Sequence, residues 1–201
     1  MPFPVAADHR ICFIGDSFVQ GCGDPLCLGW AGRLAQHAAA NGTALTYYNL
    51  GIRRNTSRDI AARWLQESLP RLPEESERRL VFSFGVNDTV IENGRRRVEE
   101  EESIANFRAI LRKAAAQAPV LMVGPPPLPD DAQNINIAAL DRQFAREAEA
   151  LDIPYLSVFD PLLLDEHWRV EALSNDGAHP RKLGYDRLAQ LVQQWDRWWF
   201  G

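Results

Sequence analysis

Cysteine, basic charge and long apolar runs are all scarce in this sequence. Only three of its 201 residues are cysteines, too few for a disulfide scaffold, so we expect free thiols, although Cys22 and Cys27 are near enough in sequence to pair. Acidic residues outnumber basic ones by 27 to 22, a net charge of −5, which disfavours a nucleic-acid or anionic-membrane surface. No apolar run reaches the roughly 18 residues of a transmembrane helix, so we expect no stable membrane insertion.

The start of the chain also lacks the features of a secretory signal. Residues 1–8 contain neither a basic start nor a long apolar segment. We therefore expect a cytoplasmic protein. Internal repeats, low-complexity tracts and long linkers are absent too, so the length predicts a single domain over residues 1–201.

Short apolar runs alternate with helical patterns along the chain. The runs predict strands at about 10–15, 45–50, 80–84, 120–124 and 155–159. The intervening patterns predict helices at about 29–40, 57–69, 99–118 and 135–151, a mostly irregular segment at 160–182, and a last helix at 183–199. This alternation indicates an α/β fold with a five-stranded parallel sheet, strand order 2-1-3-4-5 and helices on both faces.

The last predicted helix carries a regular apolar face. Its members recur every three or four residues: Leu188, Leu191, Val192, Trp195, Trp198 and Trp199. We interpret this face as packing against the sheet. A surface for a second copy of the chain is the alternative, because tryptophan is enriched in binding hot spots, so the oligomeric state stays open.

Polar clusters follow four of the predicted strands. They are Gly15-Asp16-Ser17, Gly51, Asn87-Asp88 and, after the fifth strand, Asp176 with His179. Each cluster alone is also compatible with a turn or a helix cap. Because the carboxyl ends of parallel strands meet at one edge of a sheet, where ligands bind, their joint placement predicts a site.

The residue types in these clusters suit nucleophilic catalysis. A serine hydroxyl attacks well only when a base takes its proton, and His179 can do so for Ser17. Asp176, three residues before His179, can orient the ring and stabilise its cation. The backbone N–H groups of Ser17 and Gly51 and the side-chain amide of Asn87 can donate to an oxyanion.

In this order, the motifs Gly15-Asp16-Ser17, Gly51, Gly85-x-Asn87-Asp88 and Asp176-x-x-His179 resemble the four sequence blocks of the SGNH hydrolases, the GDSL-type lipase and esterase superfamily. The resemblance spans about residues 10–190, and Phe18 stands where the family usually has leucine. It implies a flavodoxin-like three-layer fold and neither metal nor other cofactor. It assigns as site residues Ser17, Gly51, Asn87 and His179, with Asp176 as the triad acid. The implied partner is a small-molecule ester or thioester, because the family hydrolyses lipids, thioesters, aryl esters and acetylated sugars.

Other classes of protein fit the motifs less well. An ordinary α/β-hydrolase needs the second glycine of G-x-S-x-G, where this chain has Val19. A dinucleotide-binding loop would continue Gly21-x-Gly23 with a third glycine, but position 26 is Leu26. A metal hydrolase needs clustered ligands, and no H-E-x-x-H motif occurs. A non-catalytic or nucleotide-binding module on a flavodoxin-like fold remains the alternative to an esterase.

Three further features concern the surroundings of the site. His167 is a rival base, which we interpret as a surface or pocket-rim residue because no carboxylate stands three residues before it. Arg53 and Arg54 directly follow Gly51, where they can grip a carboxylate or phosphate, or else face solvent beside local acids. The proline-rich segment 125–134 leaves the fourth strand at the same edge, so we expect it to form a fixed wall of the cleft.

Overall fold

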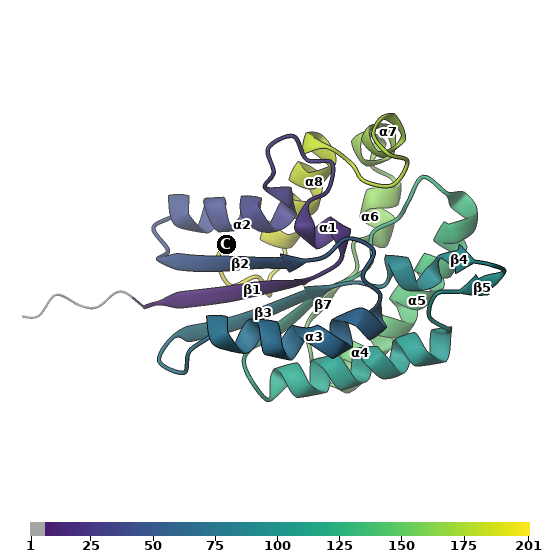
Figure 1. The fold of residues 1–201 in the computed structure, drawn as a ribbon. Helices are drawn as coiled ribbons and strands as arrows, with labels where there is room; N and C mark the ends of the chain where they lie inside the picture. Colours follow the sequence, from purple (N-terminus) through teal and green to yellow (C-terminus); the bar gives the residue numbers. More distant parts are fainter. Residues whose placement is uncertain (1–6) are drawn as a thin grey trace, which may run out of the picture.

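A computed structural model describes residues 7–201 and shows a twisted sheet between layers of helices (Figure 1). The strands of this sheet are β1 (His9–Gly15), β2 (Leu45–Gly51), β3 (Glu77–Ser83), β6 (Val120–Val123) and β7 (Tyr155–Leu156). They lie in the order β2-β1-β3-β6-β7, and every neighbouring pair is parallel. The predicted five-stranded parallel sheet and its order 2-1-3-4-5 are therefore confirmed.

The remaining elements connect these strands. The α-helices are α1 (Ser17–Gln20), α2 (Gly29–Ala40), α3 (Ser57–Ser68), α4 (Glu100–Ala115), α5 (Asp131–Ala150), α6 (Phe159–Leu163), α7 (Glu166–Ser174) and α8 (Lys182–Gln193). Two 3-10 helices and a small hairpin complete the described chain: η1 (Leu69–Arg71), η2 (Val86–Thr89), β4 (Ile91–Glu92) and β5 (Arg95–Arg96). Figure 1 shows α2 and α8 on one face of the sheet and α3 and α4 on the other.

The core consists of two apolar clusters separated by the sheet. Along β1, Ile11 and Phe13 belong to the cluster under α2 and α8, whereas Cys12 and Ile14 belong to the cluster under α3 and α4. This alternation is what the two-residue period of a strand requires when both faces are buried. Strand β1, from whose carboxyl end Ser17 follows, is therefore enclosed on both sides.

The segment after β7 differs from the expectation. Residues 160–182 were predicted to be mostly irregular, and that prediction is wrong, because α6 and α7 occupy much of the segment. Asp165 starts α7 by accepting a hydrogen bond from the Trp168 N–H at 2.9 Å, and the Trp168 side chain is buried in the core. An aspartate three residues before a buried aromatic residue is the capping signal that the sequence offered.

The two predicted elements nearest the C-terminus are shorter than expected. Strand β7 ends at Leu156, and α8 ends at Gln193 instead of continuing to position 199. Beyond α8 the chain turns, with the Trp198 N–H donating to the Trp195 carbonyl at 2.9 Å. Trp198 is nevertheless buried in the core with the apolar face of α8, as the packing interpretation predicts.

Two expectations about the whole chain can be compared with the described residues. Cys12, Cys22 and Cys27 are free thiols, as expected. No helix between residues 7 and 201 has the length and apolarity needed to cross a bilayer.

Candidate active site

Ser17 lies where β1 turns directly into α1. Asp16 caps this short helix, its Oδ1 accepting the Phe18 N–H at 2.9 Å. Gly15 cannot carry a side chain, because a Cβ there would lie 2.0 Å from the Ser83 carbonyl oxygen. The strand, the tight turn and the cap together fix Ser17 at the carboxyl edge of the sheet, with a residue exposure of only 4%.

The structure joins Ser17 to His179 and Asp176 by hydrogen bonds. His179 Nε2 lies 2.7 Å from Ser17 Oγ, and His179 Nδ1 lies 2.8 Å from Asp176 Oδ2. The other carboxylate oxygen of Asp176 accepts the backbone N–H groups of His179 and Ala178, at 2.9 and 3.1 Å. The predicted serine, base and acid thus form one continuous chain of contacts.

The charge state of Asp176 favours one tautomer of the histidine. Burial alone would raise the pKa of the Asp176 carboxyl, but hydrogen bonds from the His179 backbone, the His179 ring and the Ala178 N–H lower this pKa to about 2. Asp176 is therefore ionised at neutral pH and accepts Nδ1–H of His179. Nε2 is then left to accept the proton of Ser17.

Aromatic side chains pack beside the His179 ring. The Phe18 ring lies 4.9 Å from the His179 ring, and it stacks on Trp168 at 5.9 Å, centroid to centroid. Phe18, which stands where the family usually has leucine, is therefore buried against the His179 ring. An apolar residue at position 18 limits the rotation of the imidazole.

Helix α7 holds the loop that carries His179. Glu171 on α7 accepts three backbone N–H groups at the start of α8, from Arg181 (2.9 Å), Leu183 (3.1 Å) and Gly184 (2.8 Å). These groups have no acceptor within their own helix, so Glu171 supplies the missing cap. Helix α7 was absent from the prediction, and so was this contact.

Asn87 lies in η2 and lines the same pocket as Ser17. Its side-chain Nδ2 donates to Asp16 Oδ2 at 3.3 Å and to the Asn55 carbonyl at 3.1 Å. The bond to Asp16 is long, which leaves that N–H available to a stronger acceptor. The motif pattern predicts Asn87 as a site residue but does not indicate Asp16 as its partner, although an aspartate just before a helix is a capping signal.

The carboxyl group of Asp16 lies in an unusual environment. Burial raises its pKa to about 7, and the nearby charge of Asp88 adds to this shift, while hydrogen bonds from Phe18 and Asn87 oppose it. Asp88 is also buried, which raises its pKa, and it accepts the Ser57 N–H at 2.7 Å. Two buried carboxyl groups therefore lie directly behind the pocket.

Gly51 lies at the carboxyl end of β2 but does not line the pocket at Ser17. Its N–H donates to Asn49 Oδ1 at 3.0 Å, and Gly51 is not among the residues that line the pocket at Ser17. It pairs with Gly15 in the sheet, and a Cβ at position 51 would lie 2.2 Å from the Gln20 backbone nitrogen. Glycine at this position lets α1 approach β2, and its N–H already has an acceptor.

The pocket at Ser17 has a volume of about 300 Å³. Val86, Val90 and Leu128 give it an apolar side. Asn134 exchanges two hydrogen bonds with the backbone of Leu128, at 2.8 and 2.7 Å, which fixes this part of the 125–134 segment. The exposed His167 on α7 does not line this pocket.

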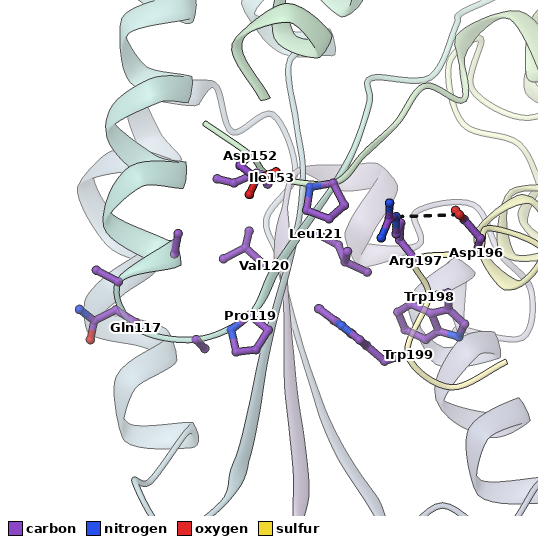
Figure 2. Close-up of a pocket in the computed structure, with 14 residues that line it drawn as sticks. Gln117, Pro119, Val120, Leu121, Asp152, Ile153, Asp196, Arg197, Trp198 and Trp199 are labelled. Atoms are coloured by element: carbon purple, nitrogen blue, oxygen red, sulfur yellow. Dashed lines mark ion pairs between the residues drawn. The ribbon is translucent and has the colours of Figure 1, made fainter. Parts of the chain in front are cut away.

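A second hollow, of about 780 Å³, is shown in Figure 2. Pro119, just before β6, and Val120, the first residue of β6, line it together with Trp198 and Trp199. Because the strands are parallel, a hollow at the start of β6 lies at the opposite edge of the sheet from Ser17. No serine or histidine is among its lining residues, so we assign it no role in catalysis.

Solved structures share this architecture over nearly its whole length. An α/β hydrolase enzyme, LAE5, from the metagenome of Lake Arreo has a TM-score of 0.75 and 22% identity, covering 93% of this chain and 94% of its own. A catalytic mutant of Axe2, an acetylxylan esterase from Geobacillus stearothermophilus, has a TM-score of 0.77 and 17% identity, covering 96% and 95%. A lipase/acylhydrolase from Enterococcus faecalis has a TM-score of 0.69 and 22% identity, covering 92% and 93%. The fold is that of the SGNH hydrolases.

Residues 13–187 match the GDSL-like lipase/acylhydrolase family. The chain belongs to this family and is an enzyme of its ester-hydrolase class. No curated protein matches the sequence. The resemblance drawn from the four sequence blocks is therefore confirmed at the level of the family and the fold.

Proposed function

We propose that this protein cleaves small carboxylic esters or thioesters through an acyl-enzyme on Ser17. The observation that supports this most strongly is the chain of contacts from Asp176 through His179 to Ser17, at 2.8 and 2.7 Å. A nucleophile and base within hydrogen-bond reach, with the base oriented by a carboxylate, is the arrangement that activates a serine.

The reaction proceeds in two halves. Ser17 Oγ attacks the carbonyl carbon while His179 Nε2 takes the hydroxyl proton, and His179 then returns this proton to the leaving alcohol or thiol as its bond to the acyl carbon breaks. Water next attacks the acyl-enzyme, giving its proton to His179, and the acid leaves as Ser17 recovers its proton. Asp176 keeps its negative charge throughout and stabilises the imidazolium.

Three donors are proposed for the oxyanion. The Ser17 N–H is the first of α1 and has no acceptor among residues 7–201. The Asn87 amide can exchange its long bond to Asp16 for a bond to the developing charge. The turn after Gly51 is a candidate for the third donor, because Arg53 and Arg54 line the pocket and neither backbone N–H has an acceptor in the described chain.

The test is a hydrolysis panel together with labelling of Ser17 by a fluorophosphonate. The panel contains p-nitrophenyl esters of rising chain length, acyl-CoAs and acetylated sugars, the last because one structural neighbour is an acetylxylan esterase. We expect Ser17→Ala and His179→Ala each to lose several orders of magnitude in kcat, and the double variant to lose little more. His167→Ala is the control variant and should retain full activity.

Three results would contradict this mechanism. Full turnover by Ser17→Ala would remove the serine from the chemistry. Absence of both labelling and turnover in the wild type would favour the alternative of a non-catalytic or nucleotide-binding module, which a nucleotide titration would then examine. Loss of activity in EDTA that zinc restores would indicate metal chemistry instead.

A further inference from the structure

The guanidinium of Arg53 lies at the pocket and makes only one long ion pair among the described residues. It lines the pocket that contains Ser17, and its side chain is 62% exposed. Its nearest carboxylate is Asp176, with Nη2 3.8 Å from Oδ2, which is beyond hydrogen-bond distance. Within residues 7–201, no carboxylate or carbonyl oxygen lies within hydrogen-bond distance of its guanidinium, whose other polar neighbour is the Cys22 thiol.

Asp176 is not a free partner for Arg53, because it is already engaged. Its two oxygens accept hydrogen bonds from the His179 ring, the His179 N–H and the Ala178 N–H. A carboxylate that orients the catalytic base has little capacity left for a second cation. The donors of Arg53 are therefore available to a ligand.

The neighbouring arginine has a different environment. Arg54 donates to Glu92 at 2.6 Å, and Arg97 lies 3.7 Å from the same carboxylate. The Glu92 carboxylate is thus shared by Arg54 and Arg97 on this side of the pocket. Together with Arg53, three guanidinium groups here share two carboxylates, Glu92 and Asp176, although the whole chain carries a net charge of −5.

The backbone that carries these arginines is strained. The turn from Ile52 to Asn55 is closed by a 3.2 Å hydrogen bond, and Arg54 has φ = 65°. Glycine or asparagine is usual at this place, since a left-handed backbone costs another residue about 1 kcal/mol. Such outliers persist at functional sites, which motivates a role for this turn beyond closing the chain.

Arg53 also borders a neighbouring hollow of about 550 Å³, formed with residues 20–24 and 51–52. It stands on the Asp176 side of the nucleophile. The leaving group of an ester must lie on that same side, because His179 has to deliver a proton to it. Arg53 therefore faces the alcohol portion of the substrate.

Resting on the function proposed above, we propose that Arg53 binds an anionic group, a carboxylate or a phosphate, on the alcohol portion of the ester. A guanidinium presents paired N–H donors that match both groups in a bidentate manner. A chain of net negative charge repels anions at long range, so an anionic substrate needs a local cation to reach Ser17.

The experiment compares three acetyl esters of similar shape. They are methyl 4-acetoxybenzoate, which is neutral, 4-acetoxybenzoate and 4-acetoxyphenyl phosphate. All three yield the same acetyl-enzyme, so ratios of kcat/KM isolate the contacts made by the leaving group. We expect Arg53→Gln to lower the ratio of anionic to neutral ester by about tenfold or more, as for loss of a charge-assisted hydrogen bond.

Two further variants separate local binding from general electrostatics. Arg58→Gln removes the same charge one turn away, from a side chain that pairs with Glu102 and does not line the pocket, so its ratio should match wild type. Arg53→Lys keeps the charge without the bidentate donors and should fall between wild type and Arg53→Gln. The anion whose ratio falls further in Arg53→Gln identifies carboxylate or phosphate as the preferred group.

The failure of this inference is distinguishable from failure of the proposed function. If wild type neither hydrolyses the neutral ester nor reacts with a fluorophosphonate, the esterase mechanism itself is wrong. If the neutral ester is hydrolysed and Arg53→Gln leaves both anionic ratios unchanged, or Arg58→Gln lowers them equally, the anion site is refuted while the esterase stands.

Discussion

Replacing Asp16 by asparagine should make the protein more stable at alkaline pH and a poorer catalyst. The side chain is 2% exposed and accepts hydrogen bonds from the Phe18 N–H and from Asn87 Nδ2. Burial, aided by the charge of Asp88, raises its pKa from 3.8 to about 7. Keeping an ionised carboxylate at this position therefore costs stability.

The sign and size of this cost follow from proton uptake. Because the folded-state pKa of Asp16 lies above its unfolded-state pKa of 3.8, folding binds a proton between these two values. The contribution of Asp16 to the free energy of unfolding is fully present below pH 3.8 and is lost as the pH rises to about 7. A shift of about three units corresponds to roughly 4 kcal/mol.

Urea unfolding of wild type and Asp16→Asn across this pH range measures the effect. The difference in free energy of unfolding, variant minus wild type, should rise by about 1.4 kcal/mol per pH unit between about pH 5 and pH 7, then level off. Asp196→Asn is the control, because its carboxylate is 82% exposed. A difference for Asp16→Asn that is flat with pH would refute the assigned environment of this carboxyl group.

Catalysis should change in the opposite direction. An asparagine at position 16 can still accept the Phe18 N–H, but its NH₂ group would then face the NH₂ group of Asn87. Two donors cannot pair, so Asn87 would leave its position beside the oxyanion. We expect kcat per fluorophosphonate-titrated site to fall by up to about 10²–10³, the cost of losing an oxyanion donor. Normal turnover in a stabilised Asp16→Asn would show that Asp16 does not position Asn87.

Three other substitutions examine single contacts. Asn87→Ala should lower kcat by about 10²–10³ with KM little changed, and normal turnover per titrated site in a destabilised variant would make Asn87 a turn residue only. Arg33→Ala leaves the buried carboxylate of Asp24 without its ion pair, so urea unfolding should show a loss of about 3–5 kcal/mol. Glu171→Ala should slow fluorophosphonate labelling of Ser17, because it releases the start of α8. Glu171→Gln keeps one acceptor oxygen and should slow labelling less. Labelling rates equal to wild type in both variants would contradict this positioning role.

Some parts of the fold could be read from the sequence because their signals are local and repeated. Strand β1 is an uninterrupted apolar run, and its burial on both faces is what such a run predicts. The alternation of runs and helical patterns was sufficient for the strand order, since right-handed crossovers leave few topologies. Helices α6 and α7 were not predicted because each is short. Helix α7 depends on the burial of Trp168 more than on its own periodicity.

The sequence by itself determined the residue types of the candidate site and the edge of the sheet at which they meet, because parallel strands bring their carboxyl ends together whatever the details of packing. Only the tertiary structure decided which polar group faces which. The N–H of Gly51 bonds to Asn49 two residues away, and the Asn87 amide bonds to Asp16 across a gap of 71 residues. Among residues 7–201, the nearest carboxylate to Arg53 is Asp176, at 3.8 Å. Hydrogen bonds act over about 3 Å, so they depend on distances that no spacing in the sequence specifies.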